Sequence, residues 1–256
     1  MTQSPAQERN NNTLGCFTDS AVALLMAIAA MLIATAFLVV WVPLDGSRNY
    51  YEHHFFGPAA MMACGQGVCA PVDGLCPELD AFLTGKAEAF DPKTLPDDFR
   101  TQNLDSYAQM HRNLLWLVGL VWMLCGISWK ALTLVSVLLY AMTALGAYGL
   151  FRLGIGRALS AAATLLLLLS PAVLCWLPNL RDFSKAPFFL VAMGLMGLLV
   201  IYPVTRRRLY GYAAALGAVV GAGMGFRTDL LICVLPSLAV LLVFTRIEGK
   251  RALPAR

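Results

Sequence analysis

The stretch AVALLMAIAAMLIATAFLVVWV, residues 21–42, is an apolar run without a single charged side chain. At about 1.5 Å per residue, an α-helix of this length crosses the hydrocarbon core of a bilayer. The run is too long for the core of a signal peptide, and no small-residue cleavage site follows it. We therefore expect an uncleaved first membrane span here.

The composition of the whole chain is that of a membrane protein. Its 256 residues are 59% hydrophobic and 13% charged, whereas soluble domains are about half apolar and a quarter charged. The net charge of +4 is small, and the arginines lie at the ends of apolar runs without interleaved aromatic residues. This pattern argues against a nucleic-acid partner.

More apolar runs follow, and all but the first of them have the length of spanning helices. They cover residues 114–127, 131–151, 158–177, 186–204, 210–226 and 230–244. The run 114–127 is short and is bordered by Arg112 and Lys130. It either crosses the membrane or lies in the interface, and His111 before it is expected on the surface.

The positions of arginine and lysine decide between these two possibilities, because basic residues favour the cytoplasmic side. If 114–127 does not cross and the N-terminus is cytoplasmic, most basic residues near span ends face inward. Those residues are Arg9, Arg152, Arg157, Arg206, Arg207, Arg208, Arg246, Lys250, Arg251 and Arg256. If 114–127 does cross, the triplet Arg206–Arg208 faces outward. We therefore predict six spans, with both termini cytoplasmic.

The predicted fold is thus all-α, a multi-pass membrane helix bundle in five parts. These are a cytoplasmic tail (1–20), the first transmembrane helix (21–43), an extracytoplasmic loop with an interfacial helix (44–130), a five-helix bundle (131–245) and a basic cytoplasmic tail (246–256). The loop is acidic and rich in proline and glycine, so we expect short surface helices and no sheet in it.

Three of the seven cysteines, Cys64, Cys69 and Cys76, share this loop. Their spacing lacks the paired C-x-x-C sets of structural zinc, so no metal site is predicted. In an oxidising compartment the three thiols can form one disulfide. Their spacing does not determine which pair would form it.

A first candidate site follows the first span, in the segment LDGSRNYYEH at residues 44–53. Asp45 lies where the span leaves the membrane, a position that suits a general base open to water and to headgroups. Tyr50 and Glu52 of the same segment are candidate substrate-binding residues. The alternative is an ordinary helix end with solvated side chains.

A second candidate site is the segment WLPNLRDFSKAPF, residues 176–188. A carboxylate next to the bilayer core is costly, so Asp182 indicates a functional site. Arg181 and Lys185 flank it, and two cations at a membrane face suit a phosphate group. The alternative is that Asp182 only stabilises the start of the next helix.

A third candidate site is the segment GAGMGFRTD, residues 221–229. Its glycines permit close helix approach or a re-entrant turn, and no strand precedes them, which excludes a dinucleotide-binding turn. Arg227 either contacts a lipid phosphate or pairs with Asp229. We count both among the candidate substrate-binding residues.

The order of these elements resembles the N-terminal module of GT-C membrane glycosyltransferases, which include protein O-mannosyltransferases and bacterial lipid A aminoarabinose transferases. The resemblance covers about residues 21–245. It rests on an aspartate after the first span, a long outer loop, a span ending in Leu-Leu-Leu-Ser-Pro, an Arg-Asp turn and a Gly-Phe-Arg turn. This chain has Asp-Gly where relatives have Asp-Glu, and Gly-Phe-Arg where Thr-Lys is common.

The resemblance implies transfer of a sugar from a polyprenyl-phosphate donor to a lipid, glycan or protein acceptor outside the cytoplasm. Asp45 is similar to the first-loop aspartate that acts as catalytic base or binds the acceptor, and Asp182 looks like the second-loop acidic residue of the same catalytic site. Arg181, Lys185 and Arg227 would bind the phosphate. No cofactor is implied, and a divalent metal is left open. The alternatives are a non-catalytic lipid-binding subunit or degenerate relative, and a small transporter; the transporter is disfavoured because ionisable groups lie at span ends and not at the midplane.

Overall fold

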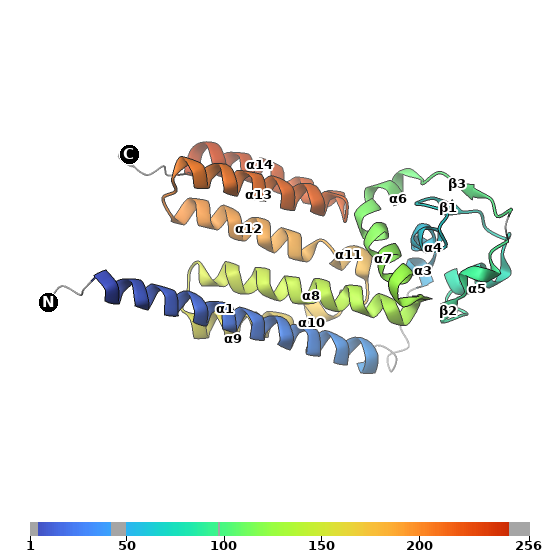
Figure 1. The fold of residues 1–256 in the computed structure, drawn as a ribbon, viewed down its shortest axis with the longest axis horizontal. Helices are drawn as coiled ribbons and strands as arrows, with labels where there is room; N and C mark the ends of the chain where they lie inside the picture. Colours follow the sequence, from blue (N-terminus) through green and yellow to red (C-terminus); the bar gives the residue numbers. More distant parts are fainter. Residues whose placement is uncertain (1–4, 42–49, 97, 246–256) are drawn as a thin grey trace.

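The computed structural model describes residues 5–41, 50–96 and 98–245 (Figure 1). These residues are mostly helical. Three helical segments are long and apolar enough to cross a membrane, namely Asp19–Val40, Trp129–Arg152 and Leu180–Ile201. The prediction of a mainly helical chain with membrane-length helices is therefore confirmed, and it points to a membrane protein.

The long helices lie side by side and form a bundle (Figure 1). The bundle consists of α1 (Pro5–Ala36) with its π-helical continuation η1 (Phe37–Trp41), α8 (Trp129–Arg152), α9 (Arg157–Leu168), α10 (Pro171–Leu174), α11 (Leu180–Phe183), α12 (Ala186–Ile201), α13 (Arg206–Met224), η3 (Thr228–Cys233), α14 (Val234–Ala239) and η4 (Val240–Phe244). Helix α8 is central, since it packs against α1, α9 and α12.

Residues 50–128 form a separate group of short elements at one end of the bundle, here called the loop subdomain (Figure 1). Its elements are α3 (Tyr50–Phe55), α4 (Gly57–Ala63), β1 (Ala70–Pro71), α5 (Pro77–Leu83), β2 (Ala89–Phe90), η2 (Pro92–Thr94), β3 (Thr101–Gln102), α6 (Ser106–Met110), α7 (Arg112–Cys125) and β4 (Ile127–Ser128). The expected short helices are present.

The expectation of no sheet in this region is wrong. Strand β1 pairs antiparallel with β3, and β2 pairs antiparallel with β4. The second pair joins Phe90 to Ile127 and so fixes the loop subdomain next to the start of α8. Each strand has only two residues, which is too short for an alternating pattern to reveal it.

Helix α7 runs across the end of the bundle (Figure 1). One of its faces, with Leu114, Val118 and Trp122, is buried against α4 and α8. The opposite face, with Trp116 and Leu124, is exposed. The helix therefore connects the loop subdomain to the bundle.

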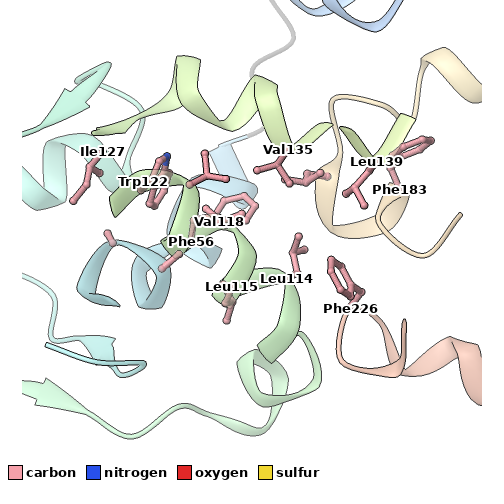
Figure 2. Close-up of a cluster of buried hydrophobic side chains, with 14 of the residues drawn as sticks. Phe56, Leu114, Leu115, Val118, Trp122, Ile127, Val135, Leu139, Phe183 and Phe226 are labelled. Atoms are coloured by element: carbon pink, nitrogen blue, oxygen red, sulfur yellow. The ribbon is translucent and has the colours of Figure 1, made fainter. Parts of the chain in front are cut away.

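The larger of two hydrophobic cores continues from the loop subdomain into the bundle. Figure 2 shows Phe56 near Val118 and Trp122, and farther along the core Leu139 of α8 close to Phe183. A second, smaller core lies between α12, α13 and the segment η3–η4. The shared core explains why these short elements hold a defined position at the end of the bundle.

The predicted run 158–177 is broken, as the Ser-Pro pair indicates. Helix α9 ends at Leu168, and Pro171 starts the short helix α10. Proline has no N–H and clashes with the preceding turn, so a regular helix cannot continue through it. Near the break, the hydroxyl of Tyr140 donates to the carbonyl of Leu168.

The end of the bundle opposite the loop subdomain is rich in arginine. Arg152 and Arg157 form ion pairs of 2.9 and 2.7 Å with Asp19 of α1. The triplet Arg206–Arg208 starts α13 at the same end (Figure 1). No local sequence pattern identifies Asp19, because its partners lie more than a hundred residues away in the chain.

The two tryptophans of α7 provide a test of this packing. Trp122 is 1% exposed, and its indole donates to the Ser128 carbonyl at 2.9 Å, whereas Trp116 is 45% exposed. Trp122→Ala should therefore cost about 3–5 kcal/mol of stability, while Trp116→Ala should change it by roughly 0.5 kcal/mol or less. Unfolding of the purified protein in detergent measures both, and equal effects would contradict the described orientation of α7.

Candidate functional site

Two turns of the bundle meet beside the loop subdomain and bring charged side chains together. One turn contains α11 and the start of α12, and the other joins α13 to η3. Asp182 of the first turn forms ion pairs with Arg181, at 3.2 Å, and with Arg227 of the second turn. Asn179 adds a hydrogen bond to the same carboxylate at 2.7 Å.

Arg227 also contacts the second carboxylate of this group. Its Nε lies 2.8 Å from Asp229, and the ammonium of Lys185 lies 2.8 Å from the same oxygen. Arg227 therefore bridges Asp182 and Asp229. We call Arg181, Asp182, Lys185, Arg227 and Asp229 the ion cluster; all five are residues that the sequence singles out.

The local structure around Asp182 differs from the expected one. Asn179, and not Asp182, caps α11, since its side-chain oxygen accepts from the Asp182 N–H at 3.3 Å. Asp182 lies inside this short helix, and Pro187 lies in the first turn of α12. Helix capping therefore does not account for the carboxylate of Asp182, which is used by the ion cluster.

The ion cluster is only partly open to solvent. The side chain of Asp182 is 15% exposed and that of Asp229 is 51% exposed. Three cations face two carboxylates, which leaves one positive charge in excess. This formal surplus of one positive charge suits an anion.

The Gly-Phe-Arg turn is held by the loop subdomain. The backbone N–H of Asn113 donates to the Gly225 carbonyl at 2.8 Å, and its side-chain amide donates to the Ala222 carbonyl at 2.9 Å. The Nδ1 atom of His111 lies 2.6 Å from the Phe226 carbonyl. These contacts place the turn, and with it Arg227, against the start of α7.

The glycines of this turn allow close approach, as the sequence indicates. A Cβ atom on Gly225 would overlap the carboxamide of Asn113. One on Gly223 would lie 2.8 Å from Cβ of Phe188 and 2.6 Å from a methyl group of Leu230. Both distances are too short for a side chain, so neither position accepts alanine without a local shift.

An aromatic group borders the ion cluster on the side of the loop subdomain. The guanidinium of Arg181 lies 6.0 Å from the ring centroid of Tyr107, at the limit of a cation–π contact. Tyr107 and Phe55 both make edge contacts with His111 at 5.2 Å. Burial lowers the pKa of His111, and the charges of Arg227 and Arg181 act in the same direction.

The expectation that His111 is a surface residue is wrong, because only 5% of it is exposed. Tyr107 and Asn113 were not singled out either. The one available signal was the polar triplet His111-Arg112-Asn113 directly before an apolar run. Its partners lie more than a hundred residues later in the chain, so a local pattern does not identify them.

The structure does not describe the side chains of three predicted site residues. Asp45 lies outside the described residues. Tyr50 and Glu52 belong to α3 by their backbone, and their side chains lie outside the described part. Within the described part of the chain, no group of three His, Cys, Asp or Glu side chains is arranged to hold a metal ion.

The cysteines of the loop subdomain, Cys64, Cys69 and Cys76, are free thiols in the structure. Burial raises the pKa of Cys64 to about 11. Since the thiolate is the reactive form, this burial makes Cys64 a poor nucleophile.

No protein-family model and no curated protein matches the sequence, and no solved structure matches the fold.

Gly225→Ala tests the contact between the turn and Asn113. The added methyl group overlaps the carboxamide, so we expect a loss of roughly 1–3 kcal/mol of stability. Gly217→Ala inside α13 is the control, because a Cβ atom there has no neighbour within 4 Å and alanine favours the helix. Thermal unfolding in detergent measures both; a neutral Gly225→Ala would contradict the close contact.

His111 predicts a pH dependence of stability. Burial holds its pKa in the folded protein below the ordinary histidine value of about 6.5, so the folded state disfavours the protonated form. Stability is thus fully present above pH 6.5 and decreases as the pH falls from there toward the folded-state pKa. Between pH 7.5 and 5.5, His111→Gln should lose less stability than the wild type, while the control His54→Gln should follow the wild type. Parallel curves for all three proteins would refute this role.

Proposed function

We propose that the protein is a membrane glycosyltransferase of GT-C type, which transfers a sugar from a polyprenyl-phosphate donor outside the cytoplasm. The observation that supports this most is the ion cluster itself. Residues from two separate segments, 181–185 and 227–229, converge at the end of the bundle that bears the loop subdomain. The resemblance assigns the same residues to the donor phosphate and to catalysis.

The proposed topology has six crossings with both termini cytoplasmic. The crossings are α1, α8, α9–α10, α11–α12, α13 and η3–η4. Three of these contain a helix of membrane length, and the arginines of the α8–α9 turn and of the α13 start lie opposite the loop subdomain. Under the positive-inside rule, the ion cluster then faces the extracytoplasmic side.

Donor binding in this proposal uses the three cations of the cluster. A guanidinium binds a phosphate through two parallel hydrogen bonds, and Arg227 and Arg181 offer such groups at 27% and 22% exposure. Lys185 adds a compact charge. Together they would stabilise the negative charge of the departing polyprenyl phosphate.

The carboxylate of Asp182 serves as the general base in this proposal. It already accepts from Arg181, Arg227 and Asn179, so an acceptor hydroxyl reaches it only if one donor moves away. A bound phosphate would compete for Arg227 and release one carboxylate oxygen. Asp182 would then take the hydroxyl proton as the acceptor oxygen bonds to the anomeric carbon. The bond from that carbon to the phosphate oxygen breaks, and the phosphate leaves with the electron pair.

Other residues keep their predicted roles in the proposal. Asp45 remains the second candidate base, and Tyr50 and Glu52 remain candidate contacts to the substrate. Asp229 holds Arg227 and Lys185 in place.

One observation favours a non-catalytic role as the second candidate. Each charged side chain of the ion cluster already has a partner inside it. Such a closed set of ion pairs can serve to fasten two turns together. A lipid-binding subunit or degenerate relative would then bind the phosphate lipid without transferring its sugar.

Arg227→Ala and Asp182→Asn separate these candidates. Charge-assisted hydrogen bonds contribute about 1.5–3 kcal/mol, so Arg227→Ala should weaken binding of a polyprenyl monophosphate roughly 10- to 100-fold. Asp182→Asn should retain binding and lose sugar transfer from polyprenyl-phosphate donors in reconstituted membranes. Native mass spectrometry in detergent measures the binding.

Arg100→Ala is the matched control, since Arg100 is an exposed cation of the loop subdomain. Arg100→Ala should leave both lipid binding and sugar transfer unchanged. Lipid binding without any transfer by the wild type would support the non-catalytic candidate. Equal binding of the polyprenyl monophosphate by the wild type and Arg227→Ala would contradict both candidate functions.

A further inference from the structure

We infer that Asn113, together with His111, is a positioning residue for Arg227: the loop subdomain holds the turn that carries this cation. Neither residue belongs to the ion cluster. That Asn113 affects phosphate binding rests on the proposed function. That Asn113 and His111 fix the position of the turn rests on their hydrogen bonds alone.

The hydrogen bonds of this junction involve three backbone carbonyls, those of Ala222, Gly225 and Phe226. The last carbonyls of a helix have no partner within the helix and usually bind water or a capping group. The Ala222 carbonyl in the last turn of α13 accepts from the Asn113 side chain as well as from the Gly225 N–H at 3.2 Å. In the turn that follows, the Gly225 and Phe226 carbonyls are bound by Asn113 and His111, at the junction of α6 and α7. The end of α13 is therefore fixed by a segment more than a hundred residues earlier in the chain.

Side-chain packing supports the same junction. The ring of Phe226 belongs to the continuous core and points toward Leu114 of α7 (Figure 2). Its ring centroid also lies 4.6 Å from that of Phe188. The absence of a side chain at Gly225 allows Asn113 to come this close. Phe226 is thus held both by its ring and by its carbonyl.

Arg227 follows Phe226 directly, in an extended backbone conformation with φ −161° and ψ 128°. Because the preceding residue is fixed, the starting point of the Arg227 side chain is fixed as well. From this position one guanidinium reaches both Asp182 and Asp229. Release of the junction would let the turn move, and the bridge between the two carboxylates would weaken.

This arrangement makes the loop subdomain part of the site. The same segment carries Tyr107, whose ring centroid lies 6.0 Å from the guanidinium of Arg181, so Arg181 as well as the turn of Arg227 lies next to the loop subdomain. A substitution at Asn113 should therefore reduce phosphate binding, although Asn113 is not one of the residues proposed to contact the phosphate. The loss of affinity should result from displacement of Arg227 and not from general unfolding.

Asn113→Ala and Asn113→Asp test the inference in the full-length protein. Both remove the amide donor to Ala222, and the aspartate keeps the size of the side chain. We expect hydrogen exchange at the amides of 225–227 to rise at least tenfold, and affinity for a polyprenyl monophosphate to fall roughly five- to tenfold. Gln109→Ala is the matched control, since that amide donates only to Leu104 within the loop subdomain.

A double substitution separates positioning from a general structural effect. If Asn113 acts through Arg227, adding Asn113→Ala to Arg227→Ala should cause no further loss of affinity. Additive losses would overturn the inference, as would faster exchange with unchanged affinity in the single variants. If the wild type binds no polyprenyl phosphate, the proposed function fails; the junction is then judged by exchange alone, and unchanged exchange in both variants overturns it.

Discussion

The docking of the loop subdomain on the end of α13 is the contact on which the candidate site depends. It combines hydrogen bonds from His111 and Asn113 with burial of Phe226 in the continuous core. The contact explains the glycines of the turn, because Gly225 must lack a side chain for Asn113 to approach. The contact also explains why α7 runs across the end of the bundle (Figure 1). The buried face of α7 packs against α4 of the loop subdomain, and Asn113 in the first turn of α7 binds the end of α13.

The ion cluster is the second consequence of this contact. Unpaired charges beside a bilayer are costly, and here each carboxylate has at least two cationic partners. The pairing lowers that cost and keeps one positive charge in excess. An arrangement of this kind can exchange an internal partner for a phosphate oxygen without leaving a charge unpaired. Exchange of partners, and not an empty anion site, is therefore the basis of the proposed chemistry.

Much of the architecture could be predicted from the sequence, because apolar runs and proline breaks are local signals. The run 21–42, the break at Pro171 and the charged pair Arg181–Asp182 are of this kind. The two-residue strands have no periodicity to detect. The burial of His111 and the ion pairs of Asp19 depend on partners far away in the chain, and no local pattern specifies such contacts. The convergence of 181–185 with 227–229 was expected from the predicted six-span topology, which puts both turns on the outer face, and from the resemblance.

The most direct measurement is an experimental structure in a lipid nanodisc with a bound polyprenyl phosphate. The account predicts phosphate density in contact with Arg227 and Arg181, with Asp182 released from Arg227 and Asn113 still bound to the turn. Phosphate density elsewhere, with the ion pair between Arg227 and Asp182 intact, would contradict it.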